Sequence, residues 1–230
     1  MRVTALEPQE HRPDRWSLFL DGAFAFGLDG ALVVAEGIAV GLELGPAAVE
    51  RLRLASAEQD LYSAALRFLE PRPRSRAEVR RRLTRPHPRR TPPEPAAVER
   101  VLERLAAAGV LDDRDFADFW IDNRDRFSPR GARALGMELR QRGVDRATAE
   151  TLTAPERDAG RALAAGRQRL RSLAGLDYQT FRTRLGPFLL RRGFDYTTAR
   201  ETVRQLWAET HDDAPPTDDD DAPSDAQSLP

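Results

Sequence analysis

The amino-acid sequence predicts a mainly α-helical protein: an elongated tandem array of three three-helix, helix-turn-helix-like repeats behind a small N-terminal extension that contains a β-hairpin. Three observations predict this fold. Alternating apolar and polar residues flank an Asp-Gly pair in the first 55 residues. Helix-capping residues recur at short intervals from Ser56 onward. A helix–turn–helix pattern also reappears after an interval of 50 residues.

The N-terminal extension is expected to combine strands with short helices. Apolar residues alternate through 16–20 and again through 24–28, on either side of Asp21-Gly22. An Asp-Gly pair between two such runs predicts a hairpin, because both turn residues need positive φ. A lone hairpin is marginal in water, so residues 3–6 are expected to add a third strand. Short helices are then expected at 31–36 and 46–54.

The remainder of the chain is predicted to be helical, with boundaries marked by capping chemistry. Capping boxes begin at Ser56, Ser75 and Thr91, each with an acid or amide three residues later. Ser128-Pro129 places a cap before a proline at the first helical position. The expected aspartate N-caps and glycine C′ residues are Asp112, Asp145, Asp177, Asp195, Gly109, Gly143, Gly175 and Gly193. The expected helices are 57–70, 76–85, 94–108, 113–126, 129–142, 146–153, 155–174, 178–192 and 196–209.

An internal repeat organises these helices. Residues 136–149 and 186–199 share seven of fourteen aligned positions, in a unit where a helix ends in Leu-x-x-Arg-Gly and an Asp cap opens the next helix. A looser copy spans 79–105 and is interrupted by a Pro-rich insertion at 85–95. The predicted divisions are an extension at 1–55, helical repeats at 56–110, 111–153 and 154–209, and a disordered acidic tail at 210–230. Such an array suits a filament or polymer as partner and is expected to be a monomer.

The residue inventory argues against an enzyme. Cysteine is absent, which excludes a disulfide scaffold and a Cys-based metal site and fits a reducing cytosol. Lysine is also absent, so a GxxxxGK[ST] phosphate loop cannot be completed, and the three histidines lie in Pro- or Asp-rich segments. Asp112-Asp113-x-Asp115 is interpreted as negative charge at a helix start rather than a metal site. No catalytic residue, cofactor or metal is expected.

The sequence also lacks a targeting or membrane signal. Its first residues contain no apolar run that could form a signal peptide, and no later segment approaches the length of a membrane span. A cytoplasmic protein with no membrane association is therefore expected.

All 36 basic residues are arginines, and seven of the 37 acidic residues lie in the last twenty positions. The body of the chain is therefore basic. The bias toward arginine is typical of a GC-rich genome, but the guanidinium fork also suits phosphate and carboxylate recognition. Two candidate binding surfaces follow, one at Arg72, Arg74, Arg76, Arg80, Arg81 and Arg82, and one at Arg130, Arg133, Arg140 and Arg142.

Three interpretations of the basic surfaces remain open: they could track DNA phosphates, grip acidic side chains of a protein partner, or be solvated faces without a ligand. Ser128-Pro129-Arg130-Gly131 resembles the entry to the second helix of a helix-turn-helix, which gives a DNA-binding transcriptional repressor as the alternative function. The acidic tail either screens the arginine surface or is a solubilising end.

Three strings in the sequence resemble the RecX family of regulatory proteins. The first is Ala65-Leu66-x-Phe68-Leu69 followed by Arg72-Pro73-Arg74-Ser75-x-x-Glu78-Val79-Arg80-x-x-Leu83. The second is Leu105-x-x-x-Gly109-Val110-Leu111-Asp112-Asp113-x-x-Phe116-Ala117. The third is Arg130-Gly131 followed by Glu138-Leu139-x-x-Arg142-Gly143-Val144, and the resemblance covers roughly 57–207. The insertion at 85–95 and the acidic tail depart from the family pattern.

The resemblance implies a cytoplasmic regulator that inserts into the groove of the RecA–DNA filament. Members of this family usually inhibit the recombinase ATPase and strand exchange, and so regulate DNA repair, recombination and the SOS response. The implied partners are the RecA filament and, weakly or non-specifically, single- and double-stranded DNA. The resemblance brings no catalytic residues with it.

Overall fold

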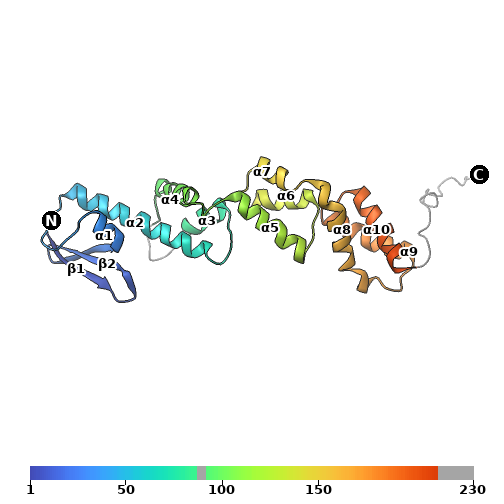
Figure 1. The fold of residues 1–230 in the computed structure, drawn as a ribbon, viewed down its shortest axis with the longest axis horizontal. Coiled ribbons are helices and arrows are strands. Elements are labelled where there is room, and N and C mark those ends of the chain that lie inside the picture. The colour runs from blue at the N-terminus through green and yellow to red at the C-terminus, as the bar shows by residue number, and fades with distance from the viewer. Residues whose placement is uncertain (87–91, 212–230) are drawn as a thin grey trace, which may run out of the picture. The chain divides into compact units, whose positions relative to one another are not determined.

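The computed structural model describes residues 1–86 and 92–211, and these residues confirm a mainly helical protein with an N-terminal antiparallel sheet (Figure 1). They divide into two compact units, one comprising residues 1–112 and the other beginning at residue 113. The predicted capping box at Thr91 and the predicted acidic tail beyond residue 211 lie outside the described residues. The five-part division of the chain stays a prediction.

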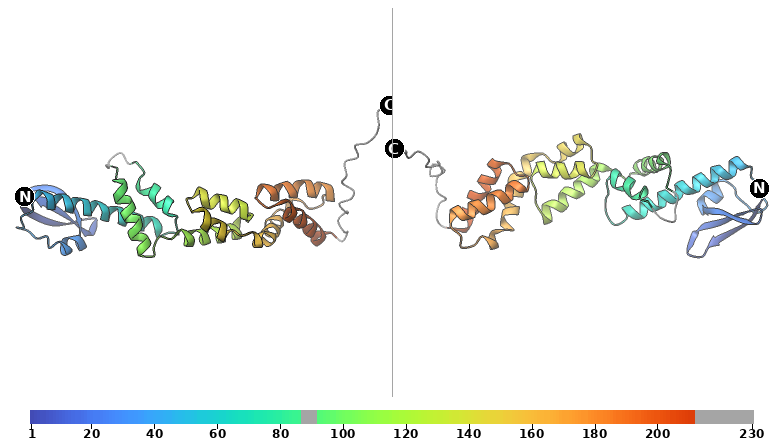
Figure 2. Two further views of the ribbon diagram at one scale, coloured as in Figure 1. Left: turned by 90° about the horizontal axis from the view of Figure 1, so that it is seen from above. Right: turned by 180° about the vertical axis from the view of Figure 1, so that it is seen from behind.

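The first unit begins with the predicted hairpin and third strand. β1 (Val3–Gln9), β2 (Arg12–Leu20) and β3 (Ala23–Asp29) form an antiparallel sheet in the order β1-β2-β3. Asp21 and Gly22 have φ of 50° and 85°, as the hairpin turn requires. The short helix α1 (Gly30–Ala35) follows β3 directly. Figure 2 shows the sheet, in blue, lying against α1 and the start of α2.

One long helix, α2 (Pro46–Leu69), replaces the two helices predicted at 46–54 and 57–70. The predicted capping box at Ser56 is wrong because Ser56 is buried inside this helix, and its hydroxyl donates a hydrogen bond to the Gly27 carbonyl of β3. The first half of α2 packs onto the sheet through Leu52. The second half contributes Ala65 to a separate core. The helix is therefore shared between the N-terminal extension and the first three-helix module.

The first module consists of the second half of α2 together with α3 (Arg76–Leu83) and α4 (Pro95–Ala107). Its core includes Val79, Leu83 and Leu102, and Val79 and Leu83 point inward as their helical spacing predicts. The Ser75 hydroxyl accepts a hydrogen bond from the Glu78 amide, which confirms this predicted N-cap.

The second unit contains two further modules with separate cores. The second module consists of α5 (Asp113–Phe127), α6 (Ala132–Gln141) and α7 (Arg146–Leu152), and the third of α8 (Asp158–Arg167), α9 (Tyr178–Arg191) and α10 (Tyr196–Thr210). Positions paired by the 50-residue repeat serve the same purpose in each core. The pairs are Leu139 and Leu189, Val144 and Phe194, and Ala149 and Ala199.

Local capping chemistry was predicted correctly at most of these helix ends. The carboxylates of Asp145, Asp177 and Asp195 accept hydrogen bonds from the amides of the third residue along, at 2.9, 2.9 and 2.7 Å. The four predicted C′ glycines, Gly109, Gly143, Gly175 and Gly193, all have positive φ.

Two further predicted helices, both in the second unit, differ from the structure. The helix expected from residue 129 begins instead at Ala132, because the carboxylate of Asp158, twenty-six residues further along the chain, accepts the Ala132 amide at 3.0 Å. The helix expected over 155–174 is broken into a 3₁₀ turn at Pro155–Arg157, α8, and a second 3₁₀ turn at Leu170–Ser172. That second turn brings Leu173 into the core of the third module.

The second and third modules meet backbone to backbone at two glycines. The Gly131 amide, in the loop before α6, donates to the Arg192 carbonyl at 3.0 Å. A Cβ on Gly131 would overlap the Gly193 carbonyl oxygen, and a Cβ on Gly193 would overlap Ala134. Arg161 of α8, 5% exposed, donates to both carboxylate oxygens of Asp125 in α5, at 2.8 and 3.1 Å. These contacts define the junction between the two modules.

We predict that Gly131→Ala lowers the free energy of unfolding of the second unit by about 1–3 kcal/mol, because the added methyl group must displace backbone atoms. Gly160→Ala in α8 is the matched control. It meets no atom within 4 Å and is expected to be neutral or stabilising. Urea denaturation of both variants measures the difference. Equal stability of the two variants would contradict the assigned close approach.

Candidate functional site

The first candidate surface is largely neutralised on one side. Arg76 and Arg80 lie on the same face of α3, as predicted, and both contact Glu99 of α4. Arg80 donates to both carboxylate oxygens at 2.7 and 2.9 Å, and Arg76 donates at 3.2 Å. Hydrogen bonds from Arg80 and then Arg76 lower the pKa of Glu99 below its ordinary value. These two arginines therefore hold α3 against α4.

The opposite side of this surface is organised around Phe68 of α2. The guanidinium carbon of Arg74 lies 4.1 Å from the ring centroid, and that of Arg82 lies 5.8 Å from it. Arg72 donates to the Pro73 carbonyl at 2.9 Å. Arg81 and Arg82 are exposed, and no carboxylate of the described residues lies within salt-bridge distance of either. Arg81 and Arg82 therefore keep their positive charge, whereas Arg72 is paired with Glu78 at 3.6 Å.

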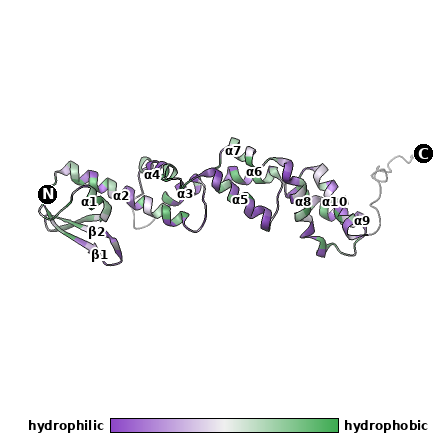
Figure 3. Ribbon diagram, viewed as in Figure 1, coloured by the Kyte–Doolittle hydropathy of each residue, from purple (hydrophilic) through white to green (hydrophobic). Residues whose placement is uncertain are grey.

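The second candidate surface is organised around a single carboxylate, that of Glu138 in α6. It accepts hydrogen bonds from the Trp120 indole and Arg124 at 2.8 Å each, and Arg130 lies 2.9 Å away. Trp120 and Arg124 both belong to α5, which is strongly hydrophilic toward its C-terminal end (Figure 3). Glu138 therefore fixes the positions of two guanidinium groups and one ring.

Trp120 also orders two arginines of this surface, the predicted Arg142 and Arg124, which was not predicted. The guanidinium carbon of Arg142 lies 3.6 Å from its ring centroid, and that of Arg124 lies 4.6 Å away. Stacking on an indole restricts a guanidinium group without using its hydrogen-bond donors. The predicted residues Arg133 and Arg140 are exposed on α6, with no salt-bridge partner among the described residues.

Sequence reasoning missed two arginines that extend this surface into the third module. The guanidinium carbons of Arg192 and Arg169 lie over the Phe188 ring, at 4.6 and 5.1 Å from its centroid. Arg192 also donates to the Pro129 carbonyl at 3.0 Å, across the junction. The internal repeat could have identified Arg192, because it aligns this residue with Arg142 of the predicted surface.

Arg192 has an unfavourable electrostatic environment. Burial lowers its pKa, and so do the nearby positive charges of Arg130, Arg169 and Arg124. It remains a cation at neutral pH because the ordinary value for arginine is above 12. The charged form of this group would therefore be stabilised by a neighbouring anion.

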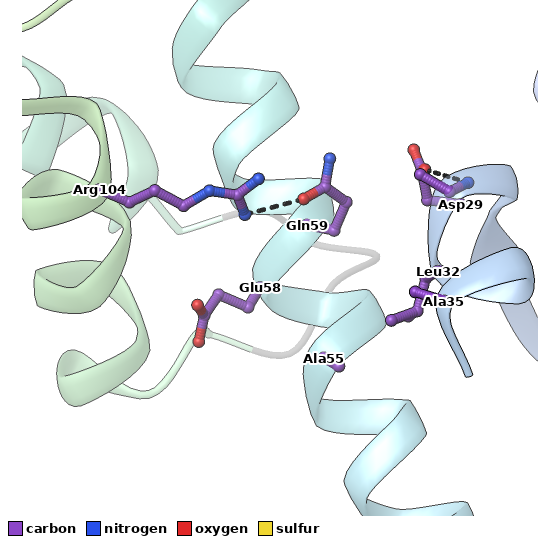
Figure 4. A pocket seen from close by; sticks show the side chains of 8 residues that line it. Asp29, Leu32, Ala35, Ala55, Glu58, Gln59 and Arg104 are labelled. Carbon is purple, nitrogen blue, oxygen red and sulfur yellow. Dashed lines mark hydrogen bonds between the residues drawn. The ribbon is translucent and has the colours of Figure 1, made fainter. Parts of the chain in front are cut away.

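A pocket in the first unit does not offer a comparable site (Figure 4). Its polar side chains already have partners within the protein. Asp29 caps α1 by accepting the Ala31 amide, Arg104 donates to Gln59 at 2.9 Å, and Glu58 accepts from Arg100 at 2.8 Å.

The described residues contain neither a group of metal ligands nor a membrane-spanning helix. None of their His, Cys, Asp and Glu side chains form a group of three or more placed to hold a metal ion. Within the same residues, no helix combines the length and the apolar character needed to cross a membrane.

We predict that Glu138→Gln lowers the free energy of unfolding of the second unit by about 1–3 kcal/mol, because it removes the charge that binds Arg124 and Arg130 in a partly buried site. Glu150→Gln is the control, since Glu150 forms only an exposed pair with Arg146. Chemical denaturation monitored by circular dichroism makes the comparison, and equal losses in both variants would argue against a structural role for Glu138.

The ion pairs of Glu99 with Arg76 and Arg80 make a pH-dependent contribution to the stability of the folded protein. A lowered pKa means that its stabilisation is present above the ordinary pKa of glutamate and is lost as pH falls through the lowered value. We expect Arg80→Gln to move the pKa of Glu99 upward toward its ordinary value. NMR titration of the side-chain carboxyl carbon measures this, with Arg53→Gln as a distant control. An unchanged pKa in Arg80→Gln would show that the ion pair is not formed in solution.

Comparison with known proteins places the chain in one family. Family models match the RecX N-terminal domain at residues 1–45, the first three-helix domain at 62–85 and the second at 112–152. The proteins named regulatory protein RecX from Mycobacterium sp. (strain KMS) and Thermobifida fusca (strain YX) are 37% and 36% identical over 154 and 157 residues. These alignments cover 64% and 65% of this chain and 81% and 82% of the relatives.

Solved structures show the same fold. A crystal structure of regulatory protein RecX aligns with a TM-score of 0.68 at 20% identity, over 87% of this chain and 98% of that one. The crystal structure of RecX from Lactobacillus salivarius aligns with a TM-score of 0.54 at 19% identity, over 66% of this chain and 97% of that one. The chain belongs to the RecX family of regulatory proteins.

Proposed function

We propose that this protein binds the RecA–DNA filament and modulates, by inhibition, the recombinase ATPase and strand exchange. Membership of the RecX regulatory family is the observation that carries the proposal. The role in DNA repair, recombination and the SOS response follows from that of the family. The proposed location is the cytoplasm, where the recombinase acts.

The side chains available on the surface support a binding function rather than a catalytic one. The most accessible charged groups on the two candidate surfaces are guanidinium groups such as those of Arg81, Arg82, Arg133 and Arg140. Arginine remains protonated at neutral pH and does not serve as an acid or base there. These groups instead present hydrogen-bond donors and positive charge to an anionic partner.

A filament of recombinase on DNA offers such anions in two forms, the phosphates of the nucleic acid and the acidic side chains of the protein. Contacts to phosphate are independent of base sequence and weaken steeply as salt rises. DNA binding by the isolated protein is therefore expected to be weak or non-specific, for single and double strands alike. The protein is proposed to act as a monomer without a cofactor.

An ATPase titration with the cognate recombinase tests the proposal. Wild-type protein is expected to reduce DNA-dependent ATP hydrolysis by RecA, and Arg81→Gln/Arg82→Gln is expected to require about tenfold more protein for the same effect, equivalent to about 1.4 kcal/mol of lost binding. The control is Arg51→Gln/Arg53→Gln, which removes two exposed arginines paired with Glu36 and Glu50.

Two outcomes would contradict the proposal. One is an unchanged ATPase rate at every ratio of protein to recombinase. The other is selective binding to one duplex sequence that survives moderate salt, which would indicate a transcriptional repressor instead.

A further inference from the structure

Four arginines gather at the junction between the second and third modules. Arg124 and Arg130 belong to α5 and the loop that follows it, whereas Arg169 and Arg192 belong to the third module. Arg124 and Arg130 share the Glu138 carboxylate, and Arg169 and Arg192 share the Phe188 ring. Arg192 links the two pairs, because it donates to the carbonyl of Pro129, the residue before Arg130. The positive charges of the other three arginines also lower the pKa of Arg192. We call the four arginines the junction cluster.

The junction cluster carries more positive charge than its surroundings neutralise. Within the described residues, the salt bridges of these four groups all go to one carboxylate, that of Glu138. Arg169 and Arg192 have no carboxylate of those residues within salt-bridge distance. Arg169 and Arg192 therefore carry positive charges that no salt bridge within the described residues offsets, although like charges repel and burial makes the repulsion stronger.

The structure holds these cations in place despite their repulsion. Arg169 and Arg192 both lie over the Phe188 ring, and Arg124 lies over the Trp120 ring. Arg192 is also tied to the Pro129 carbonyl at 3.0 Å and the Ser128 hydroxyl at 3.3 Å. Fixed donors bind an anion more tightly than mobile ones, because less side-chain entropy is lost on binding.

One donor of the junction cluster is buried and unused. The Nε atom of Arg130 is enclosed and has no hydrogen-bond partner in the described structure. A buried donor without a partner is costly. Arg130 follows Pro129, whose carbonyl accepts a hydrogen bond from Arg192, and its side chain as a whole is 37% exposed. Part of this side chain therefore remains open to solvent beside Arg192.

We propose that the junction cluster is a phosphate-binding site assembled from the second and third modules, and that its ligand is a phosphodiester of a nucleic-acid backbone. A carboxylate and a phosphodiester each carry one negative charge, so a single group of either kind would leave part of the positive charge of the junction cluster uncompensated. Exposed Arg133 and Arg140 continue the positive charge along α6 of the second module. A polymer with regularly spaced negative charges matches this extended surface, and a nucleic acid is such a polymer.

The site couples ligand binding to the contact between the modules. Its arginines come from both sides of the junction, and the Gly131–Gly193 approach brings the two loops together. A phosphate that contacts both sides therefore binds the docked arrangement more tightly than a separated one. By linkage, phosphate is expected to stabilise the second unit against unfolding.

Fluorescence anisotropy of a labelled oligothymidine with the full chain at several salt concentrations tests the site. We expect Arg169→Gln/Arg192→Gln to bind at least tenfold more weakly and to lower the slope of log affinity against log salt by about one to two. Arg146→Gln/Arg167→Gln is the matched control, since both arginines are exposed and paired outside the cluster. Affinity and slope equal to those of wild type would overturn the proposal.

Two further measurements distinguish loss of binding from misfolding of the variant. Arg169→Gln alone is included because Arg169 is exposed and holds no loop, so it is expected to fold normally and still bind more weakly. Inorganic phosphate is expected to raise the Tm of wild type relative to chloride at equal ionic strength, and not that of the double variant. Binding of polyglutamate, but not of oligothymidine, would overturn the proposal in favour of an acidic protein ligand.

The proposal rests on the proposed function for the source of the phosphate, and the two can fail separately. Oligothymidine binding is measured without recombinase, whereas the proposed function is tested by the recombinase ATPase. Loss of the first result with retention of ATPase inhibition would reject the junction site alone.

Discussion

The approach of Gly131 to Gly193 is the constraint on which the second unit depends. Each three-helix module has its own small core, so contact between modules must come from loops and surface side chains. At the junction this contact is made by backbone atoms that leave no room for a Cβ. Asp158 reinforces it by capping α6 from the other module. Because the loops are joined here, Arg130 and Arg192 are brought to one place.

The arginine-rich composition is divided between two roles. Arg80, Arg76 and Arg161 are paired with carboxylates and join helices together. Others lie against aromatic rings, with Phe68, Trp120 and Phe188 each flanked by two guanidinium groups. Stacking on a ring orders a guanidinium group and leaves its N–H donors available. A carboxylate that binds in a bidentate way occupies two of those donors. Arg124 and Arg192 combine the two roles, because each also binds an acceptor of the protein, Glu138 and the Pro129 carbonyl respectively.

Local chemistry could be predicted from the sequence, whereas contacts between distant residues could not. The hairpin turn and the aspartate caps depend on neighbours within three residues, and the structure confirms them. Ser56 failed as a cap because its hydroxyl found an acceptor on β3, and the start of α6 was misplaced because Asp158 caps it from a distance. The same limit applied to the site. Nothing local showed that Glu99 neutralises two predicted arginines, although the repeat did contain the signal for Arg192.

The central claim is that the arginine surfaces of the helical modules, rather than the N-terminal sheet, meet the anionic partner. Hydrogen exchange of the full chain, measured with and without a RecA filament on DNA, tests it most directly. The account predicts slower exchange in the loops around Arg130 and Arg192 and at the end of α3. Protection confined to β1–β3, with no change in those loops, would contradict it.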